Sequence, residues 1–465
     1  MRSLLALFFV IFLCACNTTP TYETIDGILK VPENRDNPNS RTLNLVYKVL
    51  KAKDTSARKA PIVILQGGPG GATLILESAW ENSPLRNDRD IVLMDQRGTG
   101  ESEANCAELG QAMFDIMRQD LDEEGEIKML DSLLSVCKNT MKKDGVDLAG
   151  YSSRENAADF EDLRKALDYD QWNLLGGSYG SRLGLTIMRD FPDGVRSSVL
   201  MGILAPETNL LNDGNQNFEN SLLSVLERCG KNEACNSRYP NLKERLLKTI
   251  NKIRTAPLRF EYEGKPFVLN SQDALLLIYV SLYDRHSIGA IPLLIEALEN
   301  AETEHLKKAI KGVENIHNLI NWSMNYSVMV YEEMPFYDEV AMIESLKRSE
   351  LNFGFSTQST GIAMLNDWHS YRASDIENQP VVSEIPTLMT SGALDHVTPV
   401  RNAKGALQHL KNGYELIFSD EAHNIYNPCF NEIAEDFLND PSHKPNMDCS
   451  LSPNPIEWNL QKATQ

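Results

Sequence analysis

Residues 176–180 read Gly-Gly-Ser-Tyr-Gly and fit the pattern Gly-x-Ser-x-Gly, with Ser178 at the centre. An apolar run at 172–175 precedes the motif, and an apolar helical pattern begins near Ser181. Glycines are needed beside a serine on a tight strand-to-helix turn, because side chains there would collide with neighbouring elements. Such a turn presents the hydroxyl at the carboxyl end of a sheet, where open α/β folds place their sites. The spacing predicts that Ser178 is a nucleophile.

A serine hydroxyl needs a general base near neutral pH, and in this architecture the chain order is serine, acid, histidine. His423 follows the apolar run at 414–418 by a short loop, where the last catalytic loop belongs, so it is the expected base. Histidines in helical or proline-rich stretches are poorer candidates, and these are the ones at 286, 305, 317, 409 and 443.

The acid of such a triad follows the preceding strand. Asp395 comes shortly after the apolar run at 387–390, so we expect it to hold the imidazole in one tautomer and to stabilise its protonated form. Asp420 and Glu421 are alternatives, but both lie too close to His423 in the sequence to come from a separate loop.

The tetrahedral intermediate of acyl transfer needs hydrogen-bond donors for its oxyanion. The N–H of Tyr179, directly after the nucleophile, is one expected donor, and the glycine-rich loop 66–71 supplies the other, at the N–H of Gly68. A phosphate-binding loop is the alternative interpretation of these glycines, but no Gly-Lys-Ser/Thr follows them.

Short apolar runs bounded by glycines alternate with helical patterns, which indicates a mostly parallel sheet with helices on both faces. The strand-like runs are 41–50, 61–65, 91–94, 172–175, 198–201, 387–390 and 414–418. A mainly helical stretch at 206–383 interrupts them. We therefore expect a core at 16–205 and 384–465 with a helical cap inserted between its two parts.

The composition describes a globular protein with an acidic surface. Of 465 residues, 42% are hydrophobic and 24% are charged, which excludes wholesale disorder. Lys and Arg number 45 against 65 Asp and Glu, giving a formal net charge of −20. This charge repels a phosphate backbone and argues against a nucleic-acid partner.

The first residues have the pattern of an export signal. Arg2 precedes a short apolar run at 4–13, which is too short to span a bilayer as a helix. Leu13-Cys14-Ala15-Cys16 looks like a bacterial lipobox, so we expect residues 1–15 to be removed and Cys16 to carry lipid. The mature protein is then expected in the cell envelope, facing the periplasm and anchored by lipid. A plain secretory signal is the alternative.

Apart from Cys14 and Cys16 the chain has six cysteines, and an even number in an exported chain indicates disulfides because the periplasm is oxidising. Sequence neighbourhood favours the pairs Cys106–Cys137, Cys229–Cys235 and Cys429–Cys449. No Cys-x-x-Cys pair or histidine cluster is present, so neither a zinc site nor another cofactor is expected.

Together these residues resemble a known family, the α/β-hydrolases of the proline iminopeptidase and tripeptidyl aminopeptidase group of serine exopeptidases. Residues 66–70 resemble its His-Gly-Gly-Pro-Gly oxyanion loop, and 95–102 resemble its Asp-Gln-Arg-Gly-x-Gly-x-Ser signature. The segment 384–450 is similar to the C-terminal part of tripeptidyl aminopeptidase-like (TAP-like) proteins. Gln66 stands where iminopeptidases usually carry His, which favours the tripeptidyl aminopeptidase-like branch over strict proline preference.

The resemblance implies cleavage of peptides near a free N-terminus, with the cap over the site. Such enzymes hold the substrate ammonium with an acidic group. Residues 327–333 resemble a cap motif of the family that carries an acid at the position of Glu332, and Glu207 is a second candidate. An esterase with the same triad is the first alternative. A binding protein on an inactive hydrolase fold is disfavoured, because all three triad residues are present.

Overall fold

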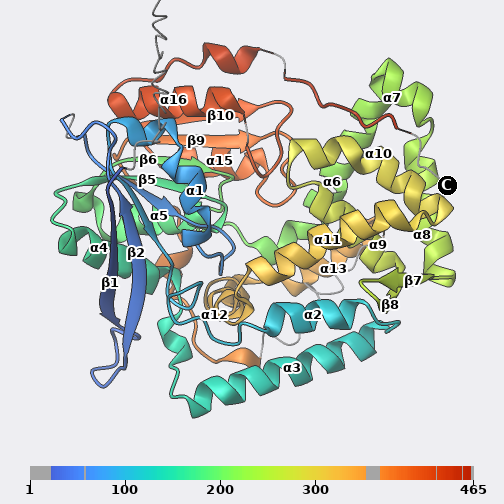
Figure 1. The fold of residues 1–465 in the computed structure, drawn as a ribbon, viewed down its shortest axis with the longest axis horizontal. Helices are drawn as coiled ribbons and strands as arrows, with labels where there is room; N and C mark the ends of the chain where they lie inside the picture. The colour runs from blue at the N-terminus through green and yellow to red at the C-terminus, as the bar shows by residue number, and fades with distance from the viewer. Residues whose placement is uncertain (1–21, 57–58, 352–366, 426, 453, 462–465) are drawn as a thin grey trace, which may run out of the picture.

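The computed structural model describes residues 22–461 apart from 57–58, 352–366, 426 and 453. Its centre is an eight-stranded sheet with the order β1-β2-β4-β3-β5-β6-β9-β10 (Figure 1). The strands are β1 (Thr24–Pro32), β2 (Thr42–Leu50), β3 (Ile62–Leu65), β4 (Ile91–Met94), β5 (Trp172–Gly177), β6 (Val195–Met201), β9 (Thr387–Gly392) and β10 (Gly413–Phe418). β1 and β2 run antiparallel and the others are parallel to one another, so the expected mostly parallel sheet is confirmed.

All the runs predicted as strands form strands, whereas β1 was not predicted. β1 is an edge strand whose residues are mostly exposed or half-buried, so its apolar pattern is weak. It also contains Gly27, where a Cβ would lie 2.2 Å from the ring of Tyr47 on β2. A glycine inside a strand lowers its apparent strand propensity, but here it makes room for a cross-strand aromatic ring.

Helices cover both faces of the sheet because alternate residues of the buried strands point to opposite sides. Val63 and Leu65 of β3 pack with α4 (Ser153–Ala166), α5 (Tyr179–Asp190) and α15 (Val400–Leu407). Ile62 and Ile64 pack with α16 (Pro428–Asn439) on the other face. The side chain of Ser152 caps α4 by accepting a hydrogen bond from the N–H of Glu155.

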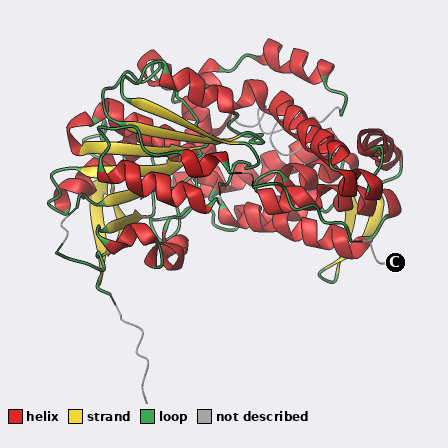
Figure 2. Ribbon diagram, turned by 90° about the horizontal axis from the view of Figure 1, so that it is seen from above, coloured by secondary structure: helices red, strands yellow, loops and turns green. Residues whose placement is uncertain are grey.

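The chain between β6 and β9 forms a cap beside the sheet (Figures 1 and 2). Its helices are α6 (Leu210–Lys231), α7 (Glu233–Arg238), α8 (Leu242–Thr255), α9 (Ser271–Ser281), α10 (Arg285–Asn300), α11 (Thr303–Leu319), α12 (Trp322–Glu332) and α13 (Glu339–Arg348). A hairpin of β7 (Leu258–Tyr262) and β8 (Lys265–Leu269), which the sequence did not predict, lies among them.

Two further segments join the cap from outside the insertion. α2 (Leu109–Met117) and α3 (Glu123–Lys143) lie between β4 and β5 in sequence, yet Phe114 of α2 packs against Tyr262 and Phe267 of the cap hairpin. The C-terminal tail also crosses to the cap, where Asn459 N–H donates to Gly289 O. The cap is therefore assembled from three parts of the chain, of which the sequence indicated one.

Three disulfides are present, Cys106–Cys137, Cys229–Cys235 and Cys429–Cys449, and these are the pairs that sequence neighbourhood favours. Among the described residues, no helix has the length and apolar character needed to cross a membrane. Residues 1–21, and with them Cys16, lie outside the described part of the chain.

Candidate active site

Ser178 lies on the turn between β5 and α5 in a backbone conformation that side chains rarely adopt, with φ 56° and ψ −126°. Its N–H donates to Met201 O at the end of β6, which fixes the turn to the sheet. Gly180 packs against the end of β3 so closely that a Cβ there would lie 1.9 Å from Leu65 O. The glycine of the motif is therefore required sterically, and the strained residue is the serine itself.

Asp395 and His423 follow β9 and β10 and form a hydrogen-bonded pair. His423 Nδ1 lies 2.9 Å from Asp395 Oδ2, and both side chains are buried. Asp395 Oδ1 accepts the N–H groups of Val397 and Thr398, each at 2.8 Å. With Nδ1 bonded to a carboxylate, Nε2 is the ring nitrogen left to act on a substrate or a nucleophile.

The sequence did not indicate Thr398, yet its hydroxyl joins the pair. Thr398 Oγ1 lies 2.6 Å from Asp395 Oδ2 and 3.1 Å from His423 Nδ1. Burial acts to raise the pKa of Asp395, but the charge and hydrogen bond of His423 and the bonds from Thr398 outweigh it and lower the pKa to about 2. Asp395 is thus an ionised partner for the imidazole across the neutral pH range.

Ser178 and His423 line one cavity of about 680 Å³ between the sheet edge and the cap. His423 and Thr398 lie over the end of β6, since a Cβ at Gly202 would be 3.2 Å from His423 Cε1 and 2.9 Å from Thr398 Oγ1. β6 is the neighbour of β5 in the sheet, so the imidazole is next to the serine turn. Ser178 and His423, both in the described part of the chain, do not form a hydrogen bond within 3.5 Å of each other. Such bonds often tighten only when substrate binds.

Gly68 and Tyr179, the expected oxyanion donors, have the following positions. Gly68 lines the cavity and has φ +123°, a conformation that favours glycine, and a Cβ there would lie 2.7 Å from Gly70 N. Tyr179 is the first residue of α5, so its N–H has no acceptor within the helix.

The Asp-Gln-Arg-Gly signature supports the Gly68 loop rather than taking part in the chemistry. Asp95 Oδ1 accepts the N–H groups of Thr73 and Leu74 at 2.6 and 2.9 Å, just after the loop. Gln96 Nε2 donates to Gln66 O at 2.9 Å. These bonds hold the glycine loop at both of its ends.

The structure corrects the prediction that Glu332 binds a substrate amine. Its carboxylate is buried, lies 2.8 Å from Arg182 Nε, and accepts hydrogen bonds from the N–H and Oγ of Ser153. Glu332 also does not line the cavity of Ser178. The sequence pattern correctly placed Glu332 on a cap helix, α12. Its side chain, however, points toward the core helices, where Arg182 and Ser153 already bind it.

Glu207 is likewise outside the cavity, and it borders a separate polar hollow with Asn209 and Arg401. Among the described residues that line the Ser178 cavity, Asp284 is the one that carries a carboxylate. Asp284 caps α10 by accepting the N–H groups of His286 and Ser287, and it has no ion-pair partner in the described part of the chain. In the sequence, Asp284 has the pattern of a helix cap. That pattern does not indicate that the residue also lines the cavity.

Most of the remaining cavity wall is apolar and comes from the cap and the loop after β3. A cluster of three or more His, Cys, Asp or Glu that could hold a metal ion is not found among the residues that the structure describes.

Comparisons with known proteins agree with this architecture. A family model described as alpha/beta hydrolase fold matches residues 60–237, and one described as TAP-like protein matches residues 355–449. The serine protease Hip1 of Mycobacterium tuberculosis (strain ATCC 25618 / H37Rv) is 22% identical over 448 residues, covering 89% of this chain and 84% of its own.

Two other relatives match over shorter stretches. The proline iminopeptidase of Aeromonas sobria is 30% identical over 200 residues, which is 41% of each chain. The tripeptidyl aminopeptidase of Streptomyces lividans is 26% identical over 194 residues, or 39% of this chain and 35% of its own. The chain thus spans less than half of these two relatives. The chain has the α/β-hydrolase fold, its residues 355–449 are similar to TAP-like proteins, and the relatives support a hydrolase.

Proposed function

We propose that the protein is a serine exopeptidase that cleaves peptide bonds near free N-termini through an acyl-enzyme. The observation that carries this proposal is the buried His423–Asp395 pair beside Ser178 at one cavity, under a cap with a single carboxylate in the described wall. The names of the relatives support the peptidase class.

In the proposed reaction, Ser178 Oγ attacks the scissile carbonyl carbon while His423 Nε2 takes the hydroxyl proton. The carbonyl π electrons move to oxygen, which the N–H groups of Gly68 and Tyr179 stabilise. The imidazolium then protonates the leaving amine as the carbon–nitrogen bond breaks, leaving an ester on Ser178. Water attacks this ester with His423 again as base, and the N-terminal fragment leaves as a carboxylic acid.

Asp284 takes the role first assigned to Glu332, that of holding the substrate ammonium. Asp284 accepts hydrogen bonds from His286 and Ser287 but has no ion-pair partner in the described chain. A carboxylate without a counter-charge on a largely apolar wall is a favourable partner for an ammonium, because a charge-assisted hydrogen bond offsets the cost of removing both groups from water.

The reaction class is tested by product analysis. A peptide of eight to ten residues, offered with a free and with an acetylated N-terminus, is digested and the fragments are weighed by mass spectrometry, beside a short-chain ester assayed separately. The proposal expects one short N-terminal fragment from the free peptide and little cleavage of the acetylated one. Equal cleavage of both, or rapid ester hydrolysis without peptide cleavage, would favour the esterase alternative.

We also propose export and lipid attachment at Cys16, supported by the sequence of residues 1–16. Lipid chains at one cysteine hold a protein to a membrane without a spanning helix. Wild-type protein should partition into the detergent phase of a detergent extraction, and Cys16→Ala should leave an unprocessed or aqueous form. Wild-type protein in the aqueous phase would contradict the lipid anchor.

A further inference from the structure

Helix α12 contacts the oxyanion loop at its N-terminal end. Asn321 N–H donates to Gly70 O at 2.9 Å, and Asn325 Nδ2 donates to Pro69 O at 2.9 Å. Ile320, just before the helix, forms an isolated antiparallel bridge with Gly71. The cap and the loop that contains Gly68 are therefore joined through main-chain atoms and the side chain of Asn325.

The C-terminal end of the same helix contacts the nucleophile turn. Glu332 Oε2 lies 2.8 Å from Ser153 Oγ, and Ser153 Oγ lies 2.9 Å from the hydroxyl of Tyr179. Asn156 Nδ2 donates to the same hydroxyl at 3.2 Å. Because Tyr179 directly follows Ser178, the cap contacts, through Ser153, the side chain of the residue whose N–H is the proposed second oxyanion donor.

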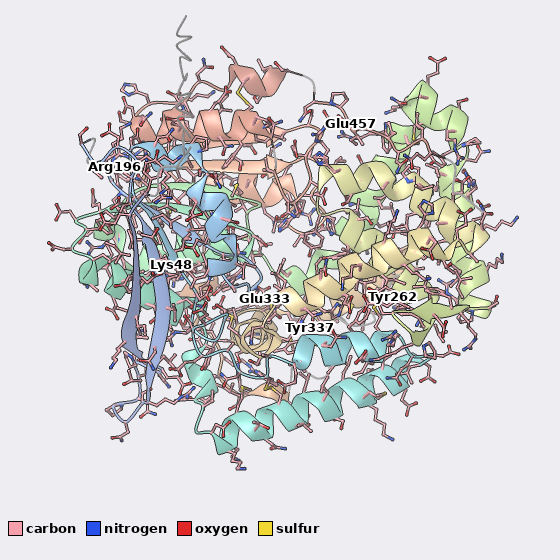
Figure 3. The ribbon with its side chains drawn as sticks, viewed as in Figure 1. Lys48, Arg196, Tyr262, Glu333, Tyr337 and Glu457 are labelled. Carbon is pink, nitrogen blue, oxygen red and sulfur yellow. A yellow bond between two sulfur atoms is a disulfide. The ribbon has the colours of Figure 1, made fainter. Side chains whose placement is uncertain are left out.

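A buried ion cluster fixes this end of α12 to α5. Arg182 of α5 lies 2.8 Å from Glu332 Oε2 and 2.7 Å from Glu333 Oε1, and all three side chains are buried. Glu333 Oε2 also accepts the N–H of Leu210 at the start of α6. Glu333 is labelled beside α12 in Figure 3. Removing one partner of a buried pair leaves an uncompensated charge, so such a contact holds its elements firmly in register.

We infer that α12 aligns the two halves of the oxyanion hole, and that Glu332 is a positioning residue that acts through Ser153 on the side chain of Tyr179 and through Arg182 on the helix α5 that Tyr179 begins. The inference rests on the proposed function, since it takes Gly68 and Tyr179 as the oxyanion donors. It gives the charged end of α12 a role in transition-state stabilisation rather than in substrate selection.

Paired inhibitors test this role. The probes are the peptide aldehyde and the peptide alcohol built on the amide that the enzyme hydrolyses fastest. The aldehyde adds Ser178 Oγ to its carbonyl carbon and places an oxyanion in the hole, whereas the alcohol only occupies the cavity. Loss of a whole oxyanion donor costs about 100- to 1000-fold in rate. A displaced donor should cost less, so Glu332→Gln should weaken aldehyde binding by about 10- to 100-fold and alcohol binding by less than about 2-fold.

A double-mutant cycle and a matched control complete the design. Ser153→Ala should weaken aldehyde binding in the same way, and its effect should not add to that of Glu332→Gln, because both act through one chain of contacts. Arg401→Gln, which breaks a cap–core contact with Asp213 and Asn217 that does not include Glu332, Ser153 or Tyr179, should leave the aldehyde-to-alcohol ratio at the wild-type value.

Three outcomes overturn the inference. Glu332→Gln could weaken both inhibitors equally, as a variant with a loosened fold would, or leave both unchanged. A wild-type enzyme that binds the aldehyde no better than the alcohol would instead remove the proposed nucleophile and oxyanion hole, and the inference with them. The hydrolysis of free and acetylated peptide should fall equally in Glu332→Gln, and a selective loss on the free peptide would restore Glu332 as the amine-binding residue.

Discussion

The two walls of the Ser178 cavity are built on different principles. The core wall consists of loops at the ends of adjacent strands, and its polar side chains bond to one another, as His423 does to Asp395 and Thr398. The cap wall is made of helix faces that present mostly apolar side chains, together with the carboxylate of Asp284. Under the proposed function, the sheet would carry the chemistry and the cap would select the substrate.

The largest expected effect falls on the core wall at Ser178. Ser178→Ala should lose about four to six orders of magnitude in kcat, because the three residues act as a unit and one missing member removes the nucleophilic pathway. A serine-directed phosphonate should add its mass to the wild-type peptide that contains Ser178 and to no peptide of the variant. Full activity in the variant would show that Ser178 is not the nucleophile and that the core wall does not carry the reaction as proposed.

Asp395→Asn should cost about 10⁴-fold in kcat, because an amide stabilises the wrong imidazole tautomer. The same residue gives a pH prediction for stability. The folded pKa of about 2 lies below the unfolded value of about 3.9, so the ionised group stabilises the fold above about pH 4. This contribution is lost as the pH falls toward 2.

Urea unfolding of wild type and Asp395→Asn across this acid range checks the sign of the effect. The difference in unfolding free energy between the two proteins should shrink as the pH falls from about 5 toward about 2. A difference that stays constant or grows would show that the carboxylate is not the stabilised form.

Smaller effects are expected from removing the disulfides. Comparing two of them distinguishes a bond within the cap from a bond that attaches a cap segment to the core. Cys106–Cys137 spans 31 residues and ties α3 to the loop after β4, whereas Cys229–Cys235 spans 6 residues within the cap. Replacing the first pair by serine should cost about 3 kcal/mol of unfolding free energy and the second pair less, since the entropic gain grows with loop length. Thermal or urea unfolding measures both. A larger loss from the short loop would mean that native packing, and not loop closure, dominates.

Sequence reasoning located the core wall because strand order and strand ends determine it. Ser178, Asp395 and His423 each follow an apolar run, and parallel strands bring their carboxyl ends to one edge. The cap wall was harder to predict. Glu332 and Asp284 both lie on cap helices, and which of them faces the cavity depends on packing between segments far apart in sequence. Thr398 was also missed, although its place three residues after Asp395 is a local signal for a hydroxyl that bonds the acid.

The central claim, that the core wall cleaves and Asp284 selects, is tested most directly by kcat/KM for one peptide amide with a free and with an acetylated N-terminus. The enzymes are wild type, Asp284→Asn and Asp338→Asn. Asparagine caps helices as well as aspartate, so the first variant removes charge while keeping the α10 cap, and the second makes the same change at the exposed cap of α13.

Wild type and Asp338→Asn should strongly prefer the free peptide. Asp284→Asn should lose about 30- to 1000-fold on it and change little on the acetylated one, since only the free ammonium needs the carboxylate. An equal loss on both peptides, or none, would contradict the assignment of selection to Asp284, and a wild type that is indifferent to acetylation would contradict the exopeptidase account.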